Sequence, residues 1–360
     1  MLLWPVVQIV LGIGLLTLGA DLLVHGAAAL AERIGLSPLV IGLTVVAFGT
    51  SMPEVSVSIG SVLTGEGGVA LGNALGSNIF NILVVLGGSA IIRPLLVDRQ
   101  IVRLDVPVMI GTAVLVFLLS LNGVLGRGEG ICLLLLGGVY TVLLVRAGLK
   151  AGAEDGLAPS APPAEARRAG SNLVRLSLGL VLLVVGARVL VDGSETAARA
   201  LGVSELVIGL TVVAAGTSLP ELATSFVAAM RGQRDIAVGN VVGSNIFNSL
   251  IVLGAAGVAS GSEGVVVPLG VLTFDLPVML AASVACLPIF FTGWTISRWE
   301  GWVFVGYYGV YLLYLVLSHT QHGAEDLVRA GLYFFAVPLT ALTLSVLAAR
   351  ELTRRRNDTS

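Results

Sequence analysis

Two short stretches of this chain combine a carboxylate, hydroxyl side chains and a proline within sequence that is otherwise apolar. In the first, Thr50 and Ser51 precede Glu54 by four and three residues, so all three side chains share one face of a helix. Pro53 has no backbone N–H, and a carbonyl one turn earlier, around Ala47 to Gly49, therefore loses its partner and becomes a further oxygen ligand. The stretch predicts a broken helical turn that presents several oxygen atoms to one side.

The same arrangement recurs 167 residues later, within a stretch of 50 residues in which about 29 positions are identical. The second copy contains Ala214, Thr217, Ser218, Pro220 and Glu221. Each copy continues into a second motif, GNALGSNIFN from Gly72 and GNVVGSNIFN from Gly239. In these motifs Ser77 and Asn81, and likewise Ser244 and Asn248, are four residues apart and share a helix face.

Brought together, the four segments offer two carboxylates and many neutral oxygens, without nitrogen or sulfur donors. This is the ligand set of hard cations, above all Ca²⁺, which takes 6–8 oxygens. A single proline among serines and threonines in a membrane helix usually marks only a kink. A carboxylate inside a membrane is expensive, however, and its duplication in the same setting favours an ion-binding site.

The elements that carry these residues must be membrane-spanning helices. The chain has 360 residues, of which 56% are hydrophobic and 12% charged, against about a quarter charged in soluble domains. Apolar runs of about 20 residues, long enough to cross a bilayer, recur along the sequence. They fall at roughly 3–24, 38–63, 69–91, 104–122, 129–148, 173–200, 205–230, 236–259, 270–292, 300–318 and 327–349. We expect an all-α polytopic membrane protein, because the strands of membrane barrels give a much weaker hydrophobic signal.

The repeat divides the chain into two homologous halves of five helices each. We expect the first half at residues 1–148, a solvated linker at 149–172, the second half at 173–318, and an extra helix with a basic tail at 319–360. Because each half has an odd number of spans, the second enters the membrane from the opposite side, which gives inverted repeats. Asp105 and Asp275 each precede a proline by two residues, and we expect them to cap helices rather than to bind ions.

The distribution of basic residues predicts the orientation. With the N-terminus outside, 16 of the 20 Lys and Arg residues fall on one side, all but Arg127, Arg188, Arg199 and Arg329. The positive-inside rule then places the linker and the C-terminus in the cytoplasm of a prokaryotic-type cell. Eleven spans fit this distribution better than ten, because ten would put the terminal arginines outside.

The doubled motif GLTVVAxGTSxPE followed by GNxxGSNIFN, in two inverted halves, resembles the alpha-repeats of the cation/calcium exchanger superfamily. It looks most like those of the prokaryotic sodium/calcium exchangers. The resemblance covers about residues 1–318 and implies a ten-helix core, alternating access at a midplane site, and helices 1 and 6 as the elements that slide. It also implies ion ligands in both repeats: Ala47, Thr50, Ser51, Glu54, Ser77 and Asn81, with Ala214, Thr217, Ser218, Glu221, Ser244 and Asn248.

The sequence departs from this family pattern in two places. Some relatives carry Asp where this chain has Asn248, which removes one ionisable group and leaves the counter-ion open. The eleventh segment lies outside the ten-helix core, and we expect it to be an anchor or an oligomer contact.

We therefore expect a secondary antiporter that exchanges Na⁺ for Ca²⁺. Ca²⁺/H⁺ exchange is the alternative, because Glu54 and Glu221 could carry protons. A cation channel is disfavoured by the inverted, proline-broken repeats and the lack of a wide polar stripe. The spans contain no Ser/His/Asp or HExxH arrangement and no nucleotide-binding loop, so we expect no enzyme and no cofactor beyond the transported ions. The expected partners are inorganic cations and membrane lipid, without nucleic acid and without a regulatory calcium-binding domain.

Overall fold

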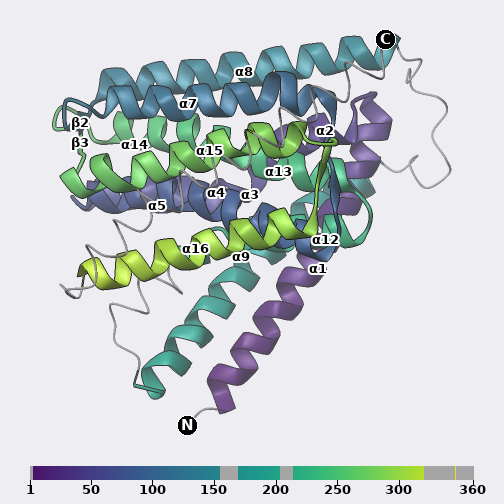
Figure 1. The fold of residues 1–360 in the computed structure, drawn as a ribbon. Coiled ribbons are helices and arrows are strands. Elements are labelled where there is room, and N and C mark those ends of the chain that lie inside the picture. The colour runs from purple at the N-terminus through teal and green to yellow at the C-terminus, as the bar shows by residue number, and fades with distance from the viewer. Residues whose placement is uncertain (1–2, 155–168, 203–213, 320–344, 346–360) are drawn as a thin grey trace.

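The computed structural model of the protein describes residues 3–154, 169–202, 214–319 and 345. Within these residues, nine helices are long and apolar enough to cross a membrane. They are Leu3–Ile34, Pro38–Leu63, Gly67–Ile92, Ile101–Leu119, Arg127–Gly152, Asn172–Ala200, Arg234–Ala259, Val271–Phe291 and Arg298–Ser318. The all-α polytopic class expected from the sequence is confirmed (Figure 1).

The two halves contain matching elements, where η denotes a π-helical segment. The first half comprises α1 (Leu3–Ile34), α2 (Pro38–Ile41), η1 (Gly42–Val46), α3 (Ala47–Thr50), α4 (Met52–Leu63), α5 (Gly67–Phe80), η2 (Asn81–Leu86), α6 (Gly87–Ile92), β1 (Leu95–Leu96), η3 (Ile101–Asp105), α7 (Val106–Leu119), β2 (Val124–Leu125) and α8 (Arg127–Glu154). The second half comprises α9 (Ala169–Ala200), α11 (Ala214–Gly216), α12 (Leu219–Met230), α13 (Arg234–Phe247), η5 (Asn248–Val252), α14 (Leu253–Ala259), β3 (Val265–Val266), η6 (Val271–Asp275), α15 (Leu276–Phe291), β4 (Thr295–Ile296) and α16 (Arg298–His319). Among the described residues, η2 matches η5, η3 matches η6, and the break before α4 matches the break before α12, because the sequences that cause them recur.

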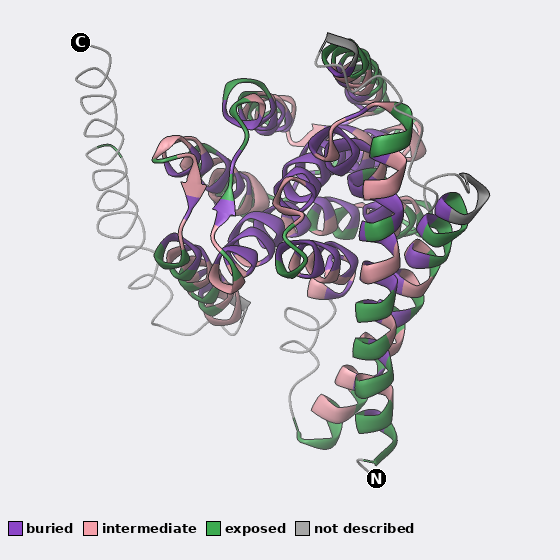
Figure 2. Cartoon of the chain, turned by 90° about the vertical axis from the view of Figure 1, so that its right-hand side faces the viewer, coloured by how far each residue is buried: buried purple, intermediate pink, exposed green. Residues whose placement is uncertain are grey.

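The helices that carry the duplicated motifs lie at the centre of the molecule. In an apolar 18-residue stretch of Arg234–Ala259, 83% of the residues are buried, against 17% in Arg298–Ser318. Figure 2 shows the central helices almost entirely buried, while most residues at the projecting ends of α1 and α9 are exposed or half-buried. Polar side chains on the central helices are therefore shielded from the surroundings by the outer helices.

Two short strand pairs show that the second half is inverted. β1 pairs antiparallel with β4, and β2 pairs antiparallel with β3. β1 follows the third span of the first half, whereas β4 follows the fourth span of the second half. Paired strands lie on the same side of the membrane, so three crossings in one half and four in the other end on the same side. The two halves therefore enter the membrane from opposite sides.

α1 and α9 pack against each other through glycines spaced seven residues apart. Gly12, Gly19 and Gly26 lie on α1, and Gly179, Gly186 and Gly193 lie on α9. A methyl group at Gly19 would lie 2.9 Å from the Gly179 carbonyl oxygen. Small residues at this spacing let two helix backbones approach closely in a membrane. The two long helices thus form a closely packed pair that runs diagonally to the rest of the bundle (Figure 1).

The turn between the two motifs is also repeated. Gly65 and Gly232 stand two residues after the last residues of α4 and α12, with φ angles of +84° and +79°. A residue with a side chain is strained at such φ values, whereas glycine adopts them readily. Gly65 and Gly232 therefore let the chain reverse tightly into α5 and α13.

Some boundaries differ from those expected. The first helix continues to Ile34, past the polar residues Asp21 and His25 at which its apolar run ends. α8 continues to Glu154 and α9 begins at Ala169, so both ends of the expected linker are helical. Residues 155–168 separate the two helices. The expected eleventh helix, at 327–349, lies outside the described residues except for residue 345.

Candidate ion-binding site

Each proline-broken turn places a serine between two helices. Ser51 separates α3 from α4 with φ −81° and ψ 3°, and Ser218 separates α11 from α12 with φ −89° and ψ 5°. These angles lie outside the α-helical region, in the sparsely populated bridge region. Pro53 and Pro220 stand two residues later, at the second position of the new helix, where a missing N–H costs little. The predicted breaks are therefore present in both repeats.

The carbonyl of Ala47 differs from the expectation. It accepts the backbone N–H of Ser51 at 3.0 Å and lies 3.3 Å from the Thr50 hydroxyl. The break falls at Ser51, where the N–H still reaches back four residues, and the proline removes the partner of Gly49 instead. Of its two lone pairs, the Ala47 oxygen thus uses one for the backbone N–H, and the Thr50 hydroxyl lies within hydrogen-bond distance of the other. The side chain of Ala214, its counterpart, lies outside the described residues.

The two glutamates are completely buried, and each receives hydroxyl groups from both repeats. Ser77 and Ser218 donate to Glu54 Oε1 at 3.3 and 3.2 Å. Ser244 and Ser51 donate to Glu221 Oε1 at 3.4 and 3.2 Å. The other oxygen, Oε2, has no hydrogen-bond partner on either glutamate. Two buried carboxylates with a free oxygen each must be neutralised by a bound cation or by protons, because uncompensated buried charge is very costly.

Asn81 and Asn248 are also fully buried, and neither side-chain amide has a hydrogen-bond partner. Each asparagine is the first residue of a π-helical segment, η2 or η5. Short π-helical segments within α-helices occur frequently at functional sites, because they redirect side chains. Four buried amide atoms at matching positions thus have no protein partner, and such groups call for a functional explanation.

A pair of asparagines belongs to this site although the sequence reasoning did not single it out. Asn73 and Asn240 are the first asparagines of the two GNxxGSNIFN motifs, and they contact the threonines of the opposite repeat. Thr217 donates to Asn73 Oδ1 at 3.1 Å, and Thr50 donates to Asn240 Oδ1 at 3.2 Å. The signal that could have found them was their identity at the 167-residue offset.

Of the twelve residues implied by the family resemblance, the structure joins the four serines to the two glutamates by hydrogen bonds, whereas Asn81 and Asn248 are buried without a hydrogen bond to them. The serines and glutamates form the contacts above, and the threonines lie next to them through Asn73 and Asn240. Within the described residues, no group of three or more His, Cys, Asp or Glu side chains could hold a metal ion. The donor set consists of two carboxylates surrounded by hydroxyl and amide oxygens.

Asp105 and Asp275 do not cap helices as expected. Each stands at the boundary between a π-helical segment and an α-helix, in helical conformation, so there is no free helix end for it to cap. Asp105 instead accepts from the Tyr140 hydroxyl and the Gln100 amide, both at 3.2 Å. Asp275 accepts from Tyr311 at 2.9 Å. These aspartates tie outer helices together.

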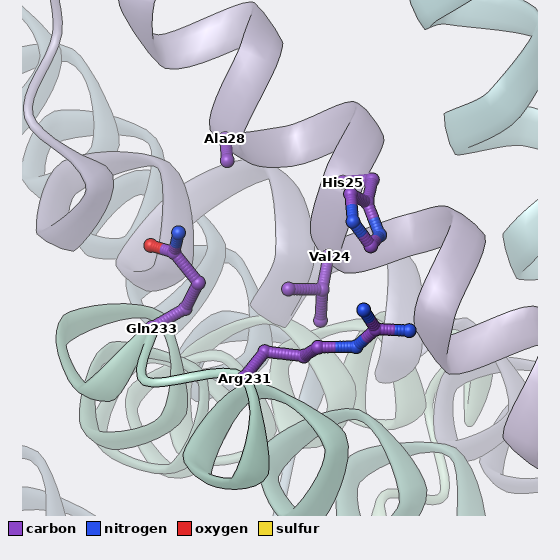
Figure 3. A pocket seen from close by; sticks show the side chains of 5 residues that line it. All are labelled: Val24, His25, Ala28, Arg231 and Gln233. Carbon is purple, nitrogen blue, oxygen red and sulfur yellow. The ribbon is translucent and has the colours of Figure 1, made fainter.

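An ion pair connects α1 to the turn between α12 and α13. The Arg231 guanidinium pairs with Asp21, and His25 Nδ1 lies 3.6 Å from the same carboxylate. Beside them is an open pocket of about 200 Å³ (Figure 3). It is lined by Val24, His25, Ala28, Arg231 and Gln233. The pair fastens α1 to a central helix hairpin from outside the glutamate site.

Comparison with known proteins agrees with this geometry. The chain matches the family described as "Sodium/calcium exchanger protein" over residues 4–146 and 171–317. The sodium/calcium exchanger MaX1 of Methanosarcina acetivorans is 42% identical over 148 residues, which are 40% of this chain and 40% of that protein. The inner membrane protein YrbG of Escherichia coli is 38% identical over 220 residues, 60% of this chain and 67% of its own length.

A solved structure has the same fold. The sodium-calcium exchanger NCX_Mj, soaked without Na⁺ and Ca²⁺, superimposes with a TM-score of 0.74 at 33% identity. The match covers 86% of this chain and 98% of that one.

The fold and the site define an integral membrane antiporter of inorganic cations, built as a ten-helix inverted repeat. The chain belongs to the sodium/calcium exchanger protein family. It is a cation/Ca²⁺ antiporter, and its work is transport rather than catalysis. The family match covers the exchanger region alone.

Proposed function

We propose that this chain exchanges Na⁺ for Ca²⁺ at one site between its two halves. The ions are bound by the twelve residues Ala47, Thr50, Ser51, Glu54, Ser77, Asn81, Ala214, Thr217, Ser218, Glu221, Ser244 and Asn248. Ca²⁺ and Na⁺ are the transported substrates. The names of MaX1 and NCX_Mj, both sodium/calcium exchangers, support this choice of ions.

The observation that carries the proposal is that a serine of each repeat donates a hydrogen bond to the glutamate of the other repeat. Because Ser51 bonds Glu221 while Ser218 bonds Glu54, the two carboxylates face a common space. Their combined charge of −2 balances one Ca²⁺. The hydroxyl and amide oxygens around them can replace the hydration shell of Na⁺ when Ca²⁺ leaves.

The choice of counter-ion follows from the residue types of the proposed ligands. A site that exchanges Ca²⁺ only for protons needs the carboxylates but not the neutral oxygens of both repeats. Asn248, like Asn81, cannot be protonated near neutral pH, so the two glutamates are the only titratable groups among the twelve proposed ligands. We therefore favour Na⁺ over H⁺ as the coupling ion.

The orientation we propose has the N-terminus outside and both the 155–168 interval and the C-terminus in the cytoplasm. The two threonine–asparagine contacts then lie towards opposite sides of the membrane. Thr217 and Asn73, near the α4–α5 turn, are partly exposed, whereas Thr50 and Asn240 are buried. In this orientation the half of the site near Asn73 is the one that opens to the outside.

The deciding experiment is Ca²⁺ uptake by proteoliposomes under separately imposed gradients. Vesicles loaded with Na⁺ and diluted into Na⁺-free buffer should take up Ca²⁺, and a pH gradient alone should not drive uptake. Full exchange under a pH gradient in Na⁺-free buffer, with no effect of Na⁺, would instead establish Ca²⁺/H⁺ exchange.

A further inference from the structure

Asn73 and Asn240 each take part in a chain of hydrogen bonds in which the acceptors of both amide hydrogens are known. Asn240 Nδ2 donates to the Glu221 carbonyl at 3.4 Å and to Ser225 Oγ at 3.0 Å. Ser225 in turn donates to the Ala237 carbonyl at 3.4 Å. An amide nitrogen carries two hydrogens, and both are used here. The amide oxygen must therefore point the other way, towards Thr50.

The mirror-related chain is built from identical residue types. Asn73 Nδ2 donates to the Glu54 carbonyl at 3.1 Å and to Ser58 Oγ at 2.9 Å. Ser58 donates to the Ala70 carbonyl at 3.4 Å. The oxygen of Asn73 accordingly faces Thr217. The two amide groups donate in the same direction, so the amide orientation is repeated in both halves of the chain.

This orientation fixes what each threonine can offer to an ion. A hydroxyl group has one proton, and it binds a cation only through its lone pairs. Since Asn240 Oδ1 accepts the Thr50 proton at 3.2 Å, the lone pairs of that hydroxyl are left for a cation. Two other acceptors compete for this proton, the Glu221 carboxylate and the Ala47 carbonyl, which lies 3.3 Å from the same hydroxyl. That carbonyl already accepts the Ser51 N–H, so a second proton from Thr50 would use its remaining lone pair.

We propose that Asn73 and Asn240 are positioning residues, which set the affinity for the transported cation by holding the hydroxyl protons of Thr217 and Thr50 away from it. Each asparagine acts from the opposite repeat. On the Thr50 side, one amide oxygen keeps two ligands available, the hydroxyl and the Ala47 carbonyl. The inference rests on the proposed function, because it requires the threonines to be ion ligands.

A double-mutant cycle tests this role, because two residues that act through one hydrogen bond are not independent. The full-length protein is purified in detergent, and ⁴⁵Ca²⁺ binding is measured for wild type, Thr50→Val, Asn240→Leu and the double variant. Loss of an outer residue that orients a ligand typically lowers metal affinity 10- to 100-fold. We expect Asn240→Leu to raise the dissociation constant at least about tenfold in the wild-type background. In the Thr50→Val background it should have no further effect.

The matched control pairs Asn240→Leu with Thr217→Val, which belongs to the other chain of hydrogen bonds. In this pair, the factors by which the two substitutions raise the dissociation constant should multiply. If Asn240→Leu weakens binding equally in the Thr50→Val and wild-type backgrounds, the asparagine acts through packing and the inference is wrong. Should Asn240→Leu fail to give a monodisperse protein, the cycle of Asn73→Leu with Thr217→Val decides, since Asn73 is partly exposed.

Glu54→Gln in the same assay separates the inference from the function on which it rests. If Glu54→Gln and wild type bind ⁴⁵Ca²⁺ equally well, the proposed site is wrong, and the inference falls with it. If Glu54→Gln abolishes binding while the cycle is multiplicative, only the role of the asparagines is overturned.

Discussion

Ser51 Oγ lies 3.2 Å from Oε1 of Glu221, a residue 170 positions further along the chain. The mirror-related contact, from Ser218 to Glu54, has the same length. Neither half of the chain therefore completes its own carboxylate environment. The break at each proline positions a hydroxyl for the other half, so the site exists only when both halves are assembled.

Removing the charge of one glutamate should abolish transport. In Glu54→Gln or Glu221→Gln, a single carboxylate faces a divalent ion, and an unbalanced buried charge costs several kcal/mol. We expect Ca²⁺ transport in proteoliposomes to fall at least about 100-fold, which corresponds to about 2.7 kcal/mol. Glu66→Gln, on the exposed turn before α5, is the matched control and should transport normally. Wild-type rates in either site variant would contradict the paired-carboxylate site.

Introducing a third acid should make transport depend on pH. Asn248 is buried and its amide has no hydrogen-bond partner, so Asn248→Asp places a buried titratable carboxyl at a proposed ligand position. We expect Ca²⁺ transport to become more sensitive to pH than in wild type, because the introduced carboxyl can gain and lose a proton whereas the amide cannot. The rates are measured in vesicles at fixed Na⁺ gradient. Asn81→Asp should behave similarly, and an unchanged pH profile in both would show that these amides lie away from the ions.

The serines that bond each glutamate within its own half should matter for Na⁺. Ser77→Ala or Ser244→Ala removes one neutral oxygen and leaves both charges, so Na⁺, which relies on neutral ligands, should be affected. We expect the Na⁺ concentration for half-maximal Ca²⁺ uptake to rise several-fold. Ser56→Ala is a suitable control, because Ser56 is exposed and bonds only the Met52 carbonyl of its own helix. An unchanged Na⁺ dependence in Ser77→Ala and Ser244→Ala would exclude these hydroxyls as Na⁺ ligands.

The contact between α1 and α9 should tolerate no methyl group. In Gly19→Ala, the new Cβ would lie 2.9 Å from the backbone of α9, and such overpacking typically costs about 1–3 kcal/mol. Gly14→Ala on the same helix meets no atom of the described residues within 4 Å, and alanine favours helix over glycine by about 1 kcal/mol. Thermal unfolding in detergent should therefore shift downward for Gly19→Ala and stay level or rise for Gly14→Ala. Equal shifts would mean that the pair is packed more loosely than the structure indicates.

The orientation can be checked by labelling single cysteines from either side of the membrane. The two native cysteines are free thiols, so Cys132→Ser and Cys286→Ser give a clean background. Ser160→Cys should react with an impermeant reagent only from the cytoplasm, and Glu66→Cys only from outside. Labelling of both positions from one side would contradict the proposed orientation.

The sequence sufficed for the fold because the signals that determine it are local and duplicated. Apolar runs of membrane length, a constant offset and an odd number of spans predict inverted repeats without any three-dimensional information. The spacing within Thr50, Ser51 and Glu54 likewise predicts which side chains share one helix face. It cannot predict which other helix lies opposite that face. For this reason only the structure shows that each serine bonds the glutamate of the other repeat, and that Asn73 and Asn240 contact the threonines of the other repeat.

The prediction for Asp105 was wrong for a similar reason. Asp105 was expected to cap a helix because Pro107 follows, but a proline two residues later does not reveal that the preceding residues are already helical. The apolar run at the start of the chain ends near residue 24, although the helix itself continues to Ile34. Hydropathy reports the length of chain that lipid covers, and a helix can extend beyond that length.

The ion pair between Asp21 and Arg231 has no mirror image, since the corresponding positions hold Arg188 and Thr64. The proposed ligands, by contrast, are identical in residue type in the two repeats. Whichever way the site opens, an arriving ion therefore meets the same chemical groups. The resting preference for one opening must come from unmatched contacts such as this one, which at an exposed position is worth at most about 1 kcal/mol. The inward-open and outward-open states should therefore differ little in free energy, so the ion gradients set the direction of transport.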